Sequence, residues 1–172
     1  MSRRAKDGFT LIEAMLAAVV LAITVVAVVA PFAAGARSQQ VEMRMSLAVG
    51  LAEQLMEEIL QKPFEEPDDG DTLAEDESSF GPEAGEATRA DFDAIDDYHG
   101  YTEAAGQIRQ SDGTLVTDPA ATGLSRHVTV QYVLVTGQDA ADDKLFFRVT
   151  VEVRHEGEPL VTLTRLVHWT AN

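Results

Sequence analysis

The chain has 172 residues, a formal net charge of −16 and no cysteine. This length fits one small domain and excludes a large multidomain enzyme. The acidic charge argues against a nucleic-acid-binding surface, which needs clustered Lys and Arg, and the lack of cysteine excludes disulfides and cysteine zinc sites.

A short basic segment at the N-terminus precedes a long apolar one. Residues 1–7 contain Arg3, Arg4 and Lys6, whereas residues 9–36 contain Glu13 as their only ionisable side chain. A helix over residues 9–36 would be about 42 Å long, which exceeds the ~30 Å of a bilayer core and the apolar length of a secretory signal peptide. We therefore expect a single-pass transmembrane helix, with the basic end in the cytoplasm and the remaining chain extracytoplasmic.

Glu13 is the unusual residue of this apolar segment. A carboxylate near the start of a spanning helix is costly in lipid unless it is paired or protonated, so it is by default a functional candidate. The alternative is an interfacial carboxylate that reaches the lipid headgroups. Taken by itself, Glu13 fits the alternative better.

The residues around Glu13 change that balance. The run Gly8-Phe9-Thr10-Leu11-Ile12-Glu13 resembles the processing motif of type IV prepilins and type II secretion pseudopilins. The resemblance implies that residues 1–8 are a leader, that prepilin peptidase cleaves after Gly8, and that Phe9 becomes N-methylated. It also implies that Glu13 attracts the charged N-terminus of a neighbouring subunit during assembly. The expected location is the bacterial inner membrane, and then a pilus or pseudopilus.

Pro31 lies inside the apolar segment and removes a backbone hydrogen bond, which predicts a helix kink. Many members of the resembling family have a proline near this depth, although here it falls one position later. A proline that marks the membrane exit is the other interpretation.

An amphipathic pattern follows over residues 37–62. Apolar residues spaced four and three apart predict one helical face: Val41, Met45, Ala48, Ala52, Leu55 and Ile59. Pro63 ends the pattern. We expect one helix over residues 9–62, whose second half covers a sheet.

Residues 63–100 form an acidic loop region, with fourteen Asp or Glu between residues 65 and 97. The composition predicts a long, mobile and solvated loop. Four aspartates are candidate Ca²⁺ ligands because Ca²⁺ takes six to eight oxygens, although their spacing is not that of an EF-hand and a charged surface turn is favoured. These are Asp91, Asp93, Asp96 and Asp97. The run from Phe92 to Tyr101 also resembles a segment of minor pilins of the mannose-sensitive haemagglutinin (MSHA) type, which implies a fixed turn.

Three alternating patterns in residues 101–172 predict strands, at residues 127–135, 145–154 and 160–169. A further small hairpin is expected around Asp112-Gly113. Short connections indicate an antiparallel meander that needs cover on one face. The predicted fold class is α+β, with a long N-terminal helix packed on a small antiparallel sheet, as in the pilin fold.

No phosphate loop, nucleophile elbow or histidine cluster is present, so we expect no enzymatic activity and no catalytic residues. The favoured function is a minor subunit of a type IV pilus or secretion pseudopilus, with prepilin peptidase and other pilin subunits as partners. A membrane-anchored binding domain that never polymerises is the alternative.

Overall fold

The computed structural model describes residues 10–64, 77–138 and 144–168 of the chain. The chain divides into two compact units, residues 1–42 and 43–172. Helix α1 (Leu11–Ile59) contributes to both. The single helix predicted for residues 9–62 is therefore confirmed, although it begins at Leu11, after the described and non-helical Thr10, and ends three residues earlier than predicted.

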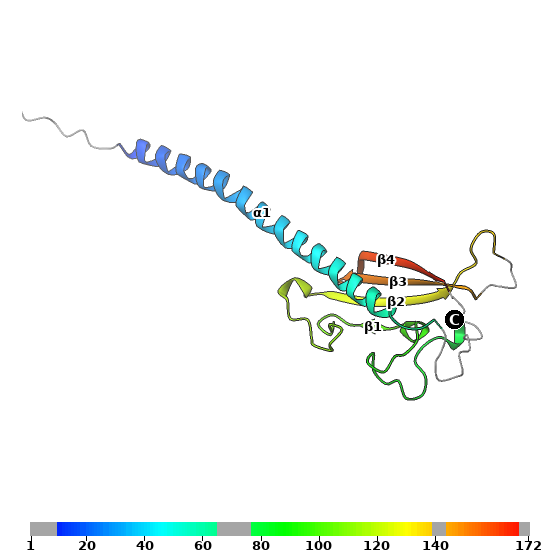
Figure 1. Ribbon diagram of the computed structural model, residues 1–172. Coiled ribbons are helices and arrows are strands. Elements are labelled where there is room, and N and C mark those ends of the chain that lie inside the picture. The colour runs from blue at the N-terminus through cyan, green and yellow to red at the C-terminus, as the bar shows by residue number, and fades with distance from the viewer. Residues whose placement is uncertain (1–9, 65–76, 139–143, 169–172) are drawn as a thin grey trace, which may run out of the picture. The chain divides into compact units, whose positions relative to one another are not determined.

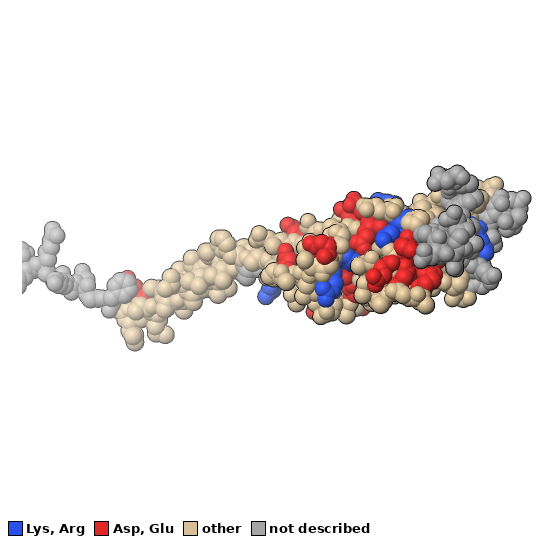
Figure 2. All heavy atoms as spheres, turned by 60° about the horizontal axis from the view of Figure 1, so that its bottom comes forward, with Lys and Arg blue, Asp and Glu red and all other residues tan. Residues whose placement is uncertain are grey.

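In the first unit, α1 is apolar on all sides. Every large apolar side chain from Leu11 to Phe32 is between 52% and 81% exposed. Figure 2 shows almost no charged side chains over this stretch in the view drawn. The helix continues through Pro31. An exposed apolar surface of this extent needs lipid or other protein to cover it.

The second unit contains a four-stranded antiparallel sheet in the order β1-β2-β3-β4 (Figure 1). Its strands are β1 (Thr102–Glu103), β2 (Leu124–Tyr132), β3 (Phe146–His155) and β4 (Glu158–His168). The predicted meander is confirmed, although β2 begins and ends three residues earlier than expected. The short β1 was not predicted, because two residues carry no alternation pattern.

The turns of this sheet follow local backbone chemistry. Between β3 and β4, Glu156 and Gly157 both have positive φ, as a tight two-residue hairpin turn requires. Around Asp112, an isolated bridge between Arg109 and Leu115 forms the small hairpin predicted there. These turns keep the strands antiparallel.

The C-terminal part of α1 packs on one face of the sheet (Figure 1), which confirms the predicted cover. From Ala48 onward the predicted stripe is buried, whereas Val41 and Met45 remain 58% and 40% exposed. The helix contributes Ala48, Leu51, Ala52, Leu55, Met56 and Ile59 to the core, and the facing strands contribute Leu124, Val128, Val130, Phe147, Val149, Val151 and Val153.

The loop prediction was wrong for residues 92–98. Phe92, Ile95 and Tyr98 are buried in the same core, so this acidic run is packed rather than solvated. It is also tied to the end of α1, because Ile95 N donates to Pro63 O at 3.1 Å and Lys62 Nζ donates to Phe92 O. The free energy gained by burying three apolar side chains, spaced three residues apart, exceeds the cost of packing their charged neighbours.

A buried ion pair joins the sheet to the helix. Arg126 on β2 and Glu103 on β1 are 1% and 5% exposed, and Arg126 Nε donates to Glu103 Oε2 at 2.5 Å. The Arg126 guanidinium also donates to Leu51 O at 2.9 Å and to Arg109 O at 2.6 Å. Burial lowers the pKa of Arg126, and the charge of Glu103 opposes that effect. One side chain thus fixes β2, the helix and the small hairpin together.

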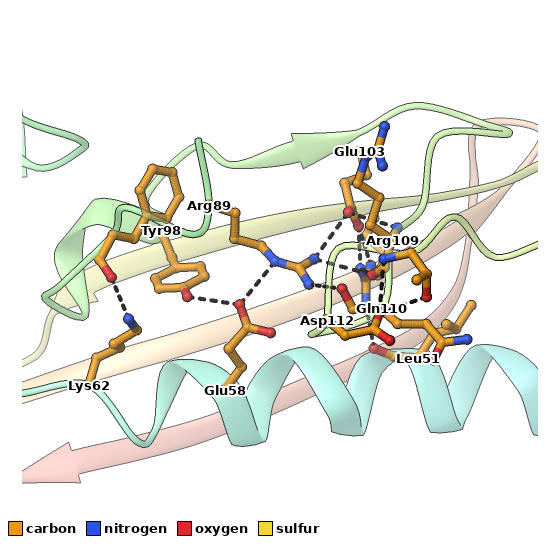
Figure 3. Close-up of polar contacts among 12 residues, drawn as sticks. Leu51, Glu58, Lys62, Arg89, Tyr98, Glu103, Arg109, Gln110 and Asp112 are labelled. Carbon is orange, nitrogen blue, oxygen red and sulfur yellow. Dashed lines mark hydrogen bonds and ion pairs between the residues drawn. The ribbon is translucent and has the colours of Figure 1, made fainter. Parts of the chain in front are cut away.

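Arg89 extends this pair into a charge-balanced network (Figure 3). Its guanidinium contacts Glu103 Oε1 at 3.1 Å and Glu58 Oε1 of α1 at 2.9 Å. Tyr98 Oη donates to the same Glu58 oxygen at 3.0 Å. Burial raises the pKa of Tyr98, which keeps its hydroxyl protonated as a donor. Two arginines and two glutamates therefore neutralise one another inside the second unit.

We predict that a fragment comprising residues 37–172 is soluble without detergent. Among the described residues, no buried core residue precedes Ala48, so removal of the apolar half of α1 leaves the core intact. The fragment should show helix and strand signals in circular dichroism and one cooperative thermal transition. An aggregated fragment, or one without a cooperative transition, would contradict this.

We also predict that Glu103→Ala lowers the free energy of unfolding of this fragment by about 3–5 kcal/mol, because it leaves buried arginine charge without its partner. Glu152→Ala is the matched control, since its pair with Arg154 is partly exposed and should contribute about 0–1 kcal/mol. Urea unfolding measures both. Equal losses in the two variants would show that the buried pair has no special role.

Candidate functional site

The first turn of α1 carries the candidate assembly residue. Thr10 precedes the helix, and Glu13 N donates to Thr10 Oγ1 at 3.3 Å and to Thr10 O at 3.1 Å. Thr10 and Glu13 have the spacing of a capping box, in which an acidic third residue also favours the positive end of the helix dipole. Glu13 is exposed. Its carboxylate thus lies at the helix start, where a charged partner can reach it.

The predicted cleavage residues Gly8 and Phe9 lie outside the described residues. Thr10 is the first described residue, and α1 begins one position later. Among the described helices, α1 is the one that is long and apolar enough to cross a membrane, and its most apolar window is not buried in the structure. The candidate surface is therefore the exposed apolar part of α1 with Glu13 near its start.

The four aspartates proposed as Ca²⁺ ligands do not converge on one point. Asp91 accepts from Thr88 N at 2.9 Å and from Thr88 Oγ1 at 2.8 Å. Asp96 is 5% exposed, and burial, with the nearby charge of Asp97, raises its pKa to about 6. Asp93 and Asp97 each have one buried carboxylate oxygen without a hydrogen-bond partner.

The structure instead groups Asp97 with two glutamates. Oxygens of Glu83, Glu86 and Asp97 all lie within 4.8 Å of one another, and this is the one such group among the described residues. Glu86 Oε2 accepts from Glu83 N and Glu86 Oε1 accepts from Asp93 N, both at 3.1 Å. Burial raises the pKa of Glu83 to about 8, with the hydrogen bond to Glu86 and the charge of Asp97 adding to the effect.

Sequence reasoning missed Glu83 and Glu86 because they precede Asp97 by 14 and 11 residues. No short ligand motif has that spacing. The group forms only because the segment between them folds back to bury Phe92 and Ile95. A signal was present in the alternation of acidic and apolar residues at 91–97, which indicates a buried rather than a solvated acidic turn.

Comparison with known proteins identifies the N-terminal segment. A family model described as the prokaryotic N-terminal methylation motif matches residues 3–29. No curated protein and no solved structure matches the chain. The matched residues include the predicted cleavage site, Glu13 and most of the exposed apolar helix, and they do not extend into the second unit. This match supports the prepilin- or pseudopilin-type N-terminal segment that the resemblance of residues 8–13 predicts.

Proposed function

We propose that the chain is a structural subunit of a type IV pilus or type II secretion pseudopilus, and a minor subunit rather than the major one. The observation that carries the proposal is a methylation motif at residues 3–29 that overlaps the apolar start of α1, where every large apolar side chain from Leu11 to Phe32 is exposed. In this proposal prepilin peptidase removes residues 1–8, Phe9 is methylated, and the chain acts by assembly rather than by catalysis.

The exposed half of α1 is covered by lipid before assembly and by other subunits after it. Before assembly it crosses the inner membrane once, with the basic leader in the cytoplasm and the head, residues 43–172, outside. After assembly the same surface packs against the helices of other subunits. Both environments exclude water from apolar side chains, so the transfer from membrane to filament has no large hydrophobic cost.

The assembly role of Glu13 follows from this change of environment. Cleavage creates a positively charged N-terminus four residues before Glu13. In a filament core of low dielectric, a carboxylate and a neighbouring ammonium attract strongly. Glu13 lies in the first turn of α1 and is exposed, so a second subunit can approach it.

A minor role is supported by the acidity of the head. Figure 2 shows acidic side chains gathered over much of the head in this view, with few basic ones between them. A subunit repeated along a whole filament must compensate repulsion between such surfaces, whereas a subunit present in few copies need not. The resemblance to MSHA-type minor pilins points the same way and stays a prediction.

We predict that Gly8→Glu blocks maturation, because a charged side chain replaces the residue that leaves the peptide bond accessible to the peptidase. The variant should accumulate as a membrane-bound precursor. Intact-mass analysis of the wild type should show loss of residues 1–8 and one added methyl group. Ser2→Glu adds the same charge away from the cleavage site and should still be processed. Wild-type surface material that retains residues 1–8 would refute the processing scheme.

We predict that Glu13→Val separates membrane insertion from assembly. Insertion should be kept, since valine is favourable in a spanning helix by a few tenths of a kcal/mol and an acid is unfavourable by about 2.5–3.5 kcal/mol. An unpaired buried ammonium costs about 3–5 kcal/mol, so filament incorporation should fall by roughly two orders of magnitude or more. Immunoblots of membrane and sheared-filament fractions measure both steps.

Glu13→Gln is the matched variant for this experiment, because it keeps the size and hydrogen-bonding groups of the capping position and removes only the charge. Like Glu13→Val, Glu13→Gln should fail to enter the filament. Normal incorporation of both variants would show that Glu13 is an interfacial carboxylate. Membrane-bound wild type that never enters the filament fraction would instead support the non-polymerising anchored domain.

A further inference from the structure

The carboxylate group formed by Glu83, Glu86 and Asp97 is not explained by the filament function. Its members come from two places in the fold, the loop at residues 83–86 and the 3₁₀ turn η2 (Asp96–Tyr98). Three acidic side chains within 4.8 Å repel one another unless something positive lies between them. The negative charge of these three side chains therefore has to be neutralised.

Asp97 shows that the group is incomplete by itself. Its side chain is 0% exposed, and Oδ2 accepts from Asp93 N at 2.9 Å and Ala94 N at 2.7 Å. Its other oxygen, Oδ1, is buried and has no hydrogen-bond partner. Ionised carboxylates are acceptors only, so Glu83 or Glu86 can satisfy this oxygen only when it carries a proton. A buried acceptor without a partner is costly, which points to a cation or a proton at this place.

No ion pair among the described residues joins a Lys or Arg side chain to this group. Within the described ranges, the arginine ion pairs join Arg89 to Glu58 and Glu103, Arg126 to Glu103, and Arg154 to Glu152. Lys62 lies three residues after the end of α1 and donates to Phe92 O. None of these contacts includes a member of the group. A cation or a proton from solution can balance the charge of the group.

We propose that Glu83, Glu86 and Asp97 bind a Ca²⁺ ion. All three donors are carboxylate oxygens, which suit a hard cation, and the group contains no His or Cys that would favour zinc. Two oxygens that each lie about 2.4 Å from one Ca²⁺ can be at most about 4.8 Å apart, so the observed spread fits a single ion. Water would complete the shell on the side of Glu83, which is exposed.

Ca²⁺ is preferred over Mg²⁺ because the donors come from irregular backbone. Mg²⁺ requires near-octahedral geometry at shorter distances, whereas Ca²⁺ accepts variable coordination. With three carboxylates and an open side, the dissociation constant should be in the range of about 0.1–1 mM. The bound ion would fasten the loop at residues 83–86 to the core turn at Asp97. This inference is independent of the filament function.

The test uses the full chain in detergent, freed of divalent ions and titrated with CaCl₂ or MgCl₂ at constant ionic strength. Wild type should show a saturable rise in melting temperature of several degrees with Ca²⁺, since a ligand of the folded state stabilises it. Glu83→Gln should weaken the Ca²⁺ response by about tenfold or more. Its side chain is exposed, so this variant should still fold.

Glu53→Gln removes the same charge from an exposed position on α1 and should respond like wild type. Asp97→Asn should also lose the Ca²⁺ response. If this substitution of a buried residue prevents folding, the exposed variant Glu83→Gln still tests the proposal. Without Ca²⁺, Glu83→Gln should melt at or above the wild-type temperature, because it relieves repulsion. An absent Ca²⁺ response, a response unchanged in Glu83→Gln, or an equal response to Mg²⁺ would overturn the proposal.

Discussion

The surface of α1 between Leu11 and Phe32 has no polar face to turn toward water. Each of its large apolar side chains is at least half exposed. This stretch needs lipid or other helices around it, and membrane anchoring and assembly follow from that need. The second half of α1 meets the same requirement within the chain, because its apolar stripe covers the sheet.

A balanced set of buried charges joins that covering helix to β1, β2 and the loop that carries Arg89. Arg126 reaches the backbone oxygen of Leu51 on the helix while it is paired with Glu103. Arg89 contacts the same helix through the side chain of Glu58, seven residues after Leu51. Buried ion pairs of this kind add little net stability over an apolar contact, but the loss of one partner is costly. They therefore restrict how the helix, β1 and β2 can pack.

Periodicity carried most of the fold prediction. The 3.6-residue pattern gave the helix and the two-residue alternation gave three long strands, since burial of one face leaves a repeating trace in sequence. The buried network left a weaker trace. Every second residue of β2 is buried, at positions Leu124, Arg126, Val128 and Val130. Arg126 therefore occupies a core position, although its charge suggests a surface position. Extending the strand pattern backward from Val128 would have revealed it.

The two candidate sites differ in how far apart their residues lie in the sequence. The processing and assembly residues form one contiguous motif and were predictable by resemblance. The Glu83, Glu86 and Asp97 group joins residues that are distant in sequence, and it depends on how residues 92–98 enter the core. Composition predicted a solvated acidic loop there. Apolar residues spaced between the acids instead fixed part of that loop in the interior.

Exclusion of water from the apolar half of α1, in the membrane and in the filament, can be measured by thiol labelling. The chain has no cysteine, so Val20→Cys and Thr164→Cys each introduce one thiol, the first on the apolar helix and the second on exposed β4. A membrane-impermeant maleimide should label Thr164→Cys but not Val20→Cys, both in sealed membrane vesicles with the head outward and in sheared filaments. Labelling of Val20→Cys in filaments, or absence of the protein from that fraction, would contradict the account.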